Sequence, residues 1–269
     1  MTRTIKRLFS YLFLIIASFI SVFPFYWMIV GATNQSVDIT KGKLTFGLAF
    51  YDNLKNVFTT TNIAQSIVNS LFISIVTTLL AILISSAAGY GFEIFSSKAR
   101  KKLFHFLLLS MMIPFAALMV PLYRLFSRLN LINNYLAIII PAAATAFLIF
   151  FFRQNTKSFP KEIAQAARVD GLSEWKIFFR IYMPMMKSTY AAAGIITFMN
   201  VWNSYLWPLI VLQTSDKMTL PLIIGNLNSS YTPDYGMIMI AIVIATIPTA
   251  LVFFIMQKSF VDGMLGSVK

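Results

Sequence analysis

The stretch that decides the fold is PKEIAQAARVDGLSEWKIFFRIYMPMMKS, residues 160–188, a polar segment between two long apolar segments. Pro160 and Glu162 are typical of a first helical turn, because proline needs no donor there and a carboxylate favours the positive end of the dipole. Gly171 favours the left-handed backbone conformation that ends helices. The sequence therefore predicts a helix, a sharp turn and a second helix that Ser173 caps.

Each predicted helix has an apolar side. In the first helix, Ile163, Ala166 and Ala167 fall at i, i+3 and i+4. In the second helix, we expect the aromatic residues to share one side: Trp175, Phe178, Phe179 and Tyr182. We expect Pro184 to end this second helix. Small residues allow close backbone approach, so the segment suits insertion into a groove of another protein. Its periodicity alone also fits an amphipathic helix lying on a membrane.

The rest of the chain is typical of an integral membrane protein. Hydrophobic residues make up 58% of the sequence and charged residues 12%, whereas a soluble domain has about 25% charged residues. Most of six apolar segments reach the roughly 20 residues that cross a bilayer. They are residues 8–33, 63–92, 103–123, 135–152, 189–212 and 236–257. We therefore expect an all-α membrane fold with six transmembrane helices and the polar segment between the fourth and fifth.

The net charge of +13 is distributed unevenly along the chain. With the N-terminus in the cytoplasm, 16 of the 22 Lys and Arg residues fall in the segments that would be cytoplasmic. This positive-inside pattern predicts that both termini are cytoplasmic. The basic charge is then a signal of topology, and we do not expect nucleic-acid binding. The first apolar run is too long for a secretion signal.

This topology divides the chain into three parts. Residues 1–62 are expected to form an N-terminal anchor helix and an external loop. Residues 63–257 are expected to form the transmembrane domain, and residues 258–269 a cytoplasmic tail.

The sequence contains no pattern for enzymatic chemistry, so we expect no catalytic site, no metal site and no cofactor bound by this chain. It has no GxxxxGK[ST] phosphate-binding loop, which excludes ATP binding in the P-loop manner. With no cysteine and one histidine, thiolate and multi-histidine metal sites are excluded. Nearly all acidic residues fall outside the predicted spans, whereas proton-coupled carriers keep carboxylates inside them.

The fifth predicted span contains neutral polar and aromatic residues that are candidates for a translocation pathway: Asn200, Trp202, Asn203 and Tyr205. Aromatic faces stack on sugar rings, and amide side chains exchange hydrogen bonds with hydroxyl groups. The structural alternative is that the asparagines bridge helices and the aromatic residues mark the membrane interface.

Residues 160–188 resemble the EAA loop in the membrane subunits of bacterial ABC importers. The similarity is greatest to the carbohydrate branch of the binding-protein-dependent type I family, which includes maltose and lactose permeases. It is carried by the pairs Ala166–Ala167 and Asp170–Gly171, and by Ile181 with Pro184. Other similar stretches are NSLFIS (69–74), MIPFAALMVPLY (112–123), WNSYLWPLIVL (202–212), KMTLPL (217–222) and QKSFVDGMLGSVK (257–269). Gln165 stands where the family pattern has a glutamate.

The resemblance implies a permease subunit in the cytoplasmic membrane of a bacterium, without enzymatic activity of its own. Such a subunit moves a sugar, here a di- or oligosaccharide, by alternating access. The loop 160–188 would dock on a separate ATPase, which holds ATP and Mg²⁺. The residues implied in docking are Glu162, Gln165, Ala166, Ala167, Asp170 and Gly171.

The implied partners are a homologous second permease subunit in a heterodimer, two ATP-binding subunits, an extracytoplasmic sugar-binding protein and the lipid bilayer. Two alternatives stay open. One is an ABC importer permease for another solute, such as an amino acid, phosphate or a polyamine. The other is a secondary transporter that works without ATP.

Overall fold

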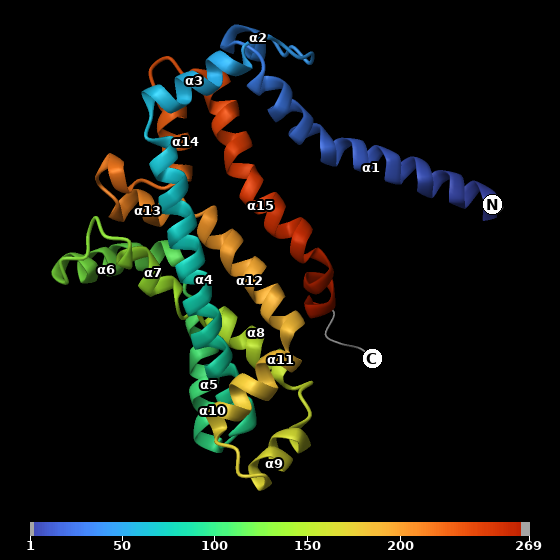
Figure 1. Ribbon diagram of the computed structural model, residues 1–269, viewed down its shortest axis with the longest axis vertical. Coiled ribbons are helices and arrows are strands. Elements are labelled where there is room, and N and C mark those ends of the chain that lie inside the picture. The colour runs from blue at the N-terminus through green and yellow to red at the C-terminus, as the bar shows by residue number, and fades with distance from the viewer. Residues whose placement is uncertain (1–2, 265–269) are drawn as a thin grey trace. The chain divides into compact units, whose positions relative to one another are not determined.

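The computed structural model describes residues 3–264, and over that range the chain contains helices and no strand (Figure 1). The chain divides into two compact units. The first unit comprises Met1–Ala64 and Ile223–Ile247, and the second comprises Gln65–Leu222 and Pro248–Lys269.

The first unit is built from helices at both ends of the chain. They are α1 (Arg3–Ala32), α2 (Ser36–Thr40), α3 (Phe50–Thr60), most of α14 (Leu220–Asn228) and the first part of α15 (Tyr235–Met264). The buried Asn53 of α3 donates its Nδ2 to the carbonyls of Ala32 at 3.0 Å and Asn34 at 2.9 Å. Ser36 donates to Oδ1 of Asp234 at 2.8 Å. These bonds join α3 to the end of α1, and α2 to the start of α15.

The second unit contains nearly all of α4 (Ile63–Ile94), which is the longest helix in the described part of the chain. The elements that follow it are α5 (Lys98–Ser110), α6 (Phe115–Arg128), α7 (Leu136–Ala142), α8 (Ala146–Thr156), α9 (Lys161–Val169), α10 (Glu174–Ile177), the π-helical turn η1 (Phe178–Tyr182), α11 (Met183–Met185), α12 (Lys187–Trp202), α13 (Leu206–Val211) and the 3-10 turn η2 (Ser215–Lys217).

Two large buried clusters hold the second unit together. The tyrosine cluster consists of Tyr90, Phe159, Ala164, Ala167, Ile177, Phe178, Tyr182 and Met186. The tryptophan cluster consists of Ile73, Phe126, Ala137, Ile138, Ile139, Trp207, Val211, Leu212 and Leu222. Because α4 contributes to both clusters, it supports both candidate sites described below.

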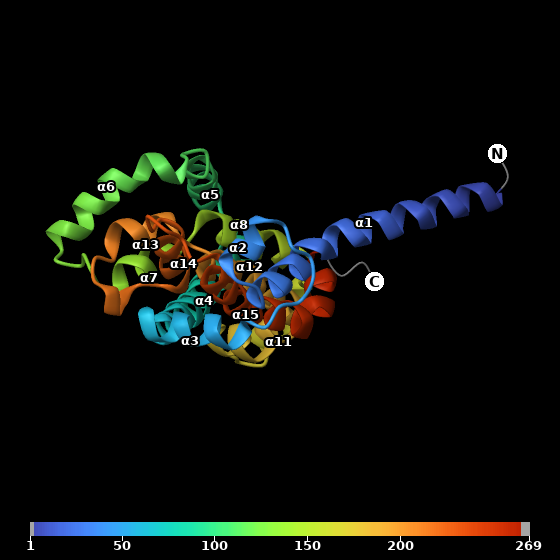
Figure 2. The ribbon, with the colours of Figure 1, turned by 90° about the horizontal axis from the view of Figure 1, so that it is seen from above.

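Four segments are long and apolar enough to cross a membrane, and they match the first, second, fourth and sixth predicted spans. They are Arg7–Ala32, Ile63–Ile94, Leu136–Thr156 and Tyr235–Ile255. The third predicted span is not one straight helix, because α5 and α6 meet at an angle of 99° (Figure 2). Pro114 lies at the start of α6 with an extended backbone, where its missing N–H needs no helical partner.

The fifth predicted span is also interrupted. Its first helix, α12, has 16 residues and ends at Trp202, and α13 begins at Leu206. A helix of that length is shorter than the roughly 20 residues of a full span. Six spans and cytoplasmic termini therefore stay predictions. At the other end, α15 continues to Met264, past the predicted start of the tail at 258, and residues 265–269 lie outside those described.

Candidate functional site

The polar segment folds as the predicted helix, turn and helix. The first helix, α9, begins after Pro160, and Gly171 follows its end with φ of +78°. The N–H of Leu172 donates to the carbonyl of Ala167 at 3.0 Å, and the N–H of Gly171 to that of Arg168 at 3.0 Å. This pair of bonds is the Schellman motif, which uses a left-handed residue to satisfy the last carbonyls of a helix. Ser173 precedes α10, but its side chain makes no capping hydrogen bond.

The apolar side predicted for α9 is only partly buried. Ala164 and Ala167 are buried in the tyrosine cluster, whereas Ile163 and Ala166 are exposed. The α4 side chain Tyr90 belongs to the same cluster, so α9 turns its small residues toward α4. Residue spacing indicates an apolar side of a helix, but it does not define which of its residues face a neighbouring helix of the same chain.

The six predicted docking residues divide accordingly. Five of them are exposed: Glu162, Gln165, Ala166, Asp170 and Gly171. Ala167 is 6% exposed and packs inward. Two apolar side chains lie beside the exposed set. Ile163, which the sequence placed on the apolar side of the helix, is 37% exposed, and Val169, which the sequence reasoning missed, is 88% exposed. An apolar, β-branched residue directly before the Asp170–Gly171 turn was the signal for Val169.

The second helix was predicted to end at Pro184, but in the structure it continues past this residue. It passes through the π turn η1 into α11, which contains Pro184, and the path breaks at Met186 with φ of −95° and ψ of 21°. The N–H of Met183 donates to the carbonyl of Phe178, five residues back. A proline ring clashes with the carbonyl four residues before it in an α-helix, and the wider π turn accommodates it.

The aromatic residues of the second helix lie on two sides. Trp175 and Phe179 are exposed, at 68% and 47%, and stack with ring centres 6.1 Å apart. Phe178 and Tyr182 are buried. The hydroxyls of Tyr182 and Thr156 lie 2.6 Å apart, and burial raises the pKa of Tyr182 to about 12.

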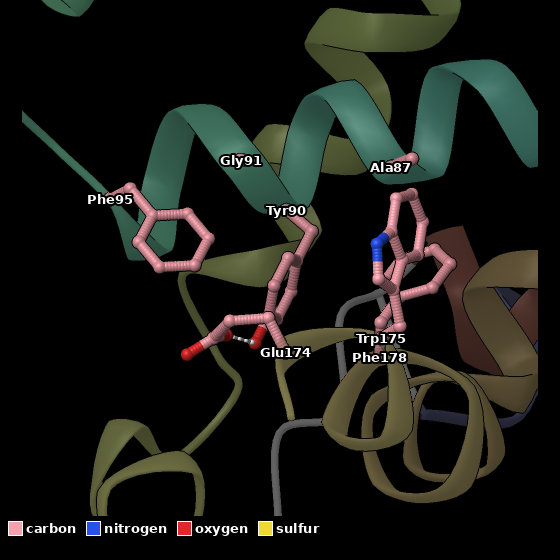
Figure 3. A pocket seen from close by; sticks show the side chains of 7 residues that line it. All are labelled: Ala87, Tyr90, Gly91, Phe95, Glu174, Trp175 and Phe178. Atoms are coloured by element: carbon pink, nitrogen blue, oxygen red, sulfur yellow. Dashed lines mark hydrogen bonds between the residues drawn. The ribbon is translucent and has the colours of Figure 1, made fainter. Parts of the chain in front are cut away.

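An ion pair closes the turn between α9 and α10. Nε of Arg168 lies 2.5 Å from Oε1 of Glu174, and this hydrogen bond raises the pKa of Arg168 above its ordinary value. Tyr90 of α4 donates to the other carboxylate oxygen of Glu174 at 3.4 Å (Figure 3). Beside them lies a cavity of about 150 Å³, lined by Ala87, Tyr90, Gly91, Phe95, Glu174, Trp175 and Phe178. The turn is thus fixed both to itself and to α4.

A second candidate site is a cavity of about 770 Å³ where three helix breaks meet. It is lined by Phe115, Ile138, Pro141, Ala142, Thr145, Asn200, Val201, Asn203, Ser204, Tyr205, Leu206 and Trp207. These residues surround the breaks between α5 and α6, between α7 and α8, and between α12 and α13. Interrupted helices inside a membrane protein are tolerated where they line a cavity, and they commonly form substrate sites there.

The structure brings three of the four predicted pathway residues to this cavity, namely Asn200, Asn203 and Tyr205. Trp202 does not line it; its side chain is 1% exposed and stacks on Phe198 with ring centres 5.8 Å apart. Trp207 lines the cavity instead, and its Nε1 donates to the carbonyl of Ala137 at 2.8 Å.

The sequence reasoning also left out Thr145 and Ser204, which line the cavity. Thr145 caps α8 by accepting from the N–H of Leu148, and this capping residue before a helix was a usable signal. The cavity lining contains no charged side chain. Among the described residues, no group of three His, Asp or Glu side chains is placed to hold a metal ion.

Comparison with known proteins gives one family. Residues 81–265 match the family described as binding-protein-dependent transport system inner membrane component. The chain is 51% identical to the lactose transport system permease protein LacG of Rhizobium radiobacter over 267 residues, covering 99% of this chain and 98% of that protein. It is 36% identical to the arabinooligosaccharides transport system permease protein AraQ of Halalkalibacterium halodurans, covering 94% and 92%.

A solved structure shares the fold. It is a bacterial ABC transporter involved in the import of the acidic polysaccharide alginate. One of its chains superposes with a TM-score of 0.86 at 20% sequence identity, covering 97% of this chain and 99% of that one.

Proposed function

Because this chain belongs to the family of binding-protein-dependent transport system inner membrane components, we propose that it is the permease subunit of an ATP-driven sugar importer. The family and the apolar helices make it a multi-pass inner membrane protein. The observation that most supports a sugar as the cargo is the 51% identity, over 99% of the chain, to a protein named as a lactose transport permease. The name of the AraQ relative supports a di- or oligosaccharide as the cargo.

In this proposal α9 and the Asp170–Gly171 turn that follows it dock on a separate ATPase. The exposed Glu162, Gln165 and Ala166 form one face of α9, and Asp170 and Gly171 form the tip that follows it. We call these five residues the docking face. Small residues at such a tip let a partner's backbone approach closely. The exposed Ile163 and Val169 add apolar area, and Ala167 supports the helix from inside. ATP and Mg²⁺ would be held by the ATPase and not by this chain.

The sugar would pass through the cavity at the three helix breaks. Asn200 and Asn203 are exposed there, and their amide groups match sugar hydroxyls. The aromatic ring of Tyr205, which is 37% exposed, offers a face for the apolar side of a sugar ring. A volume of about 770 Å³ lies within the range of about 300–1,000 Å³ typical of ligand sites.

The remaining partners follow from the same proposal. A homologous second permease subunit would complete the pathway as a heterodimer, and two ATP-binding subunits would each hold one docking loop. An extracytoplasmic sugar-binding protein would deliver the cargo. Closure of the ATPase dimer would draw the docking loops together and switch the pathway between its two orientations. Such coupling requires each state to make different contacts at both sites.

The uncharged cavity also weighs against the alternatives. Phosphate and polyamines carry charges that need charged or strongly polar partners when they leave water. None of the residues that line the cavity is charged, which favours a neutral solute such as a sugar. A proton-coupled carrier would need ionisable groups along the same pathway.

The test is co-purification of the tagged chain from mild detergent. The proposal expects a second permease-like chain and an ATPase in the purified material. It also expects hydrolysis that rises when a sugar-loaded binding protein is added. A chain that purifies alone and moves sugar in liposomes without ATP would contradict it.

A further inference from the structure

One charged cluster of the second unit lies outside both the docking face and the cavity. Glu93, in the last turn of α4, holds two cations on one carboxylate. Its Oε1 lies 2.9 Å from Nζ of Lys161, and its Oε2 lies 3.5 Å from Nε of Arg153. The Glu93 side chain is only 13% exposed. The cluster therefore joins the end of α4 to α8 and to the first residue of α9.

Arg153 is enclosed on its other side by an aromatic ring. Its guanidinium carbon lies 3.9 Å from the ring centre of Phe104, and Phe104 itself is buried. Nε of Arg153 is buried and makes no hydrogen bond, so its contact with Glu93 is an ion pair without hydrogen-bond geometry. A cation with so little access to water depends on its counter-charge.

Lys161 needs the carboxylate for a different reason. As the first residue of α9, it places a cation at the positive end of the helix dipole, which is unfavourable. Glu93 offsets that charge at the start of α9. At the other end of α9, Arg168 is held through Glu174 and Tyr90, and Tyr90 lies three residues before Glu93 on α4. The last turns of α4 thus hold both ends of α9.

We propose that Glu93 is a positioning residue that sets the orientation of the α9 docking face. This inference rests on the proposed function, because the face that it orients is the one proposed to meet the ATPase. Glu93 is not one of the docking residues and acts through Lys161 and Arg153. Without its charge, the start of α9 loses its tie to α4, and the docking face tilts relative to its partner. ATP hydrolysis is then converted less efficiently into transport.

The test compares variants of the complete importer in proteoliposomes and measures sugar molecules transported per ATP hydrolysed. Glu93→Gln keeps the side-chain shape and removes the charge, and it is expected to lower this ratio about tenfold, a typical coupling effect. Lys161→Gln is expected to lower the ratio in the same direction. Lys161→Arg keeps the charge and is expected to keep the ratio close to that of the wild type. Lys157→Gln is the matched control, because Lys157 is exposed and makes no ion pair among the described residues.

The double variant separates positioning from a merely structural role. Because Glu93 and Lys161 act through the same ion pair, Glu93→Gln with Lys161→Gln is expected to be no worse than Glu93→Gln alone. An unchanged ratio in Glu93→Gln would overturn the proposal, even if less complex assembled. So would a double variant whose loss is the product of the two single losses.

If Glu93→Gln does not assemble, the exposed Lys161→Gln decides alone, and an unchanged ratio there contradicts the proposal. Wild-type importer without ATP-driven uptake would instead overturn the proposed function, and this inference with it.

Discussion

Gly89 of α4 lies directly against the backbone of α8 at Arg153. A Cβ at position 89 would lie 2.7 Å from the backbone nitrogen of Arg153 and 2.7 Å from Cβ of Phe152. Real side chains do not approach so closely, so α4 and α8 meet at a point where only glycine fits. The same end of α4 carries Tyr90 and Glu93, which contact the α9–α10 turn.

This contact predicts opposite results for two neighbouring glycines. Gly89→Ala forces α8 away and is expected to destabilise the chain by about 1–3 kcal/mol. Gly91→Ala adds a Cβ that meets nothing within 4 Å, and it is expected to be neutral or to stabilise α4 by up to about 1 kcal/mol. Thermal unfolding of the two variants in detergent measures the difference. Equal midpoints would show that α4 and α8 are not in contact at Gly89.

The left-handed conformation of Gly171 predicts a loss of transport that is confined to this turn. Gly171 has φ of +78°, and a Cβ at this position would meet no atom within 4 Å. Within this chain, Gly171→Val therefore acts only through the backbone, at about 1–2 kcal/mol or more. We expect sugar uptake to fall strongly while membrane insertion stays intact.

Two controls accompany the Gly171 variant. Gly171→Asn tolerates positive φ and is expected to keep most of the uptake. Gly42→Val carries the same penalty at φ of +74° in the other unit, also without a neighbour, and is expected to leave coupling unchanged. Normal uptake by Gly171→Val would count against the turn as the docking tip.

Gln165 predicts a gain of function. The exposed amide stands where the resembled family has a glutamate, and a charged acceptor makes a stronger hydrogen bond to a basic partner. Gln165→Glu is therefore expected to tighten binding of the ATPase about fivefold, as measured by titration of the detergent-solubilised permease. Glu162→Gln, which removes an exposed charge from the same face, is expected to weaken it. Weaker binding in Gln165→Glu together with tighter binding in Glu162→Gln would show that the ATPase does not dock on this face of α9.

Substitutions of Asn200 and Trp202, two residues apart, are expected to have different effects, one on sugar affinity and the other on stability. Asn200→Ala removes an amide from the cavity and should raise the sugar concentration for half-maximal uptake about fivefold with normal assembly. Trp202→Ala empties a buried site and should destabilise the chain by about 3–5 kcal/mol, while surviving protein keeps its sugar affinity. An affinity change in Trp202→Ala alone would restore Trp202 to the pathway.

The buried Tyr182 hydroxyl predicts that the stability of the protein falls at alkaline pH. Thr156 donates to the carbonyl of Phe152, so Tyr182 donates to Thr156 and must be protonated. Burial raises the pKa of Tyr182 from 10.0 to about 12. The contribution of the protonated Tyr182 hydroxyl to the free energy of unfolding is therefore fully present below pH 10 and is lost between pH 10 and 12.

Tyr182→Phe tests this dependence. The variant is expected to lack the extra loss of thermal stability between pH 10 and 12 and to be about 1 kcal/mol less stable below pH 10. Parallel pH profiles of the two proteins would show that Tyr182 does not titrate in this way.

Local signals predicted the α9–α10 turn well, because Pro160, Glu162 and Gly171 act on their own backbone. The faces of both helices could not be predicted, since contact with α4 decides which alanines and aromatic residues are buried. Proline was an ambiguous signal: Pro114 marks a 99° bend, whereas Pro184 is accommodated by a π turn.

The pathway residues were predicted in part. The group around Asn203 pointed to the right segment, but the interruption between α12 and α13 changes which side chains face the cavity. Trp202 is the last residue of one helix and turns inward, while Trp207, on the next helix, lines the cavity. The sequence of 189–212 does not show where the helix is interrupted, so it could not indicate which of the two tryptophans lines the cavity.

The most direct measurement of the central claim is sugar accumulation in proteoliposomes that contain this chain with its co-purified partners and a sugar-binding protein. The account predicts uptake of a di- or oligosaccharide that requires ATP on the side of the ATPase and falls strongly in Gly171→Val while membrane insertion stays intact. Uptake that continues without ATP, or that is unaffected by Gly171→Val, would contradict it.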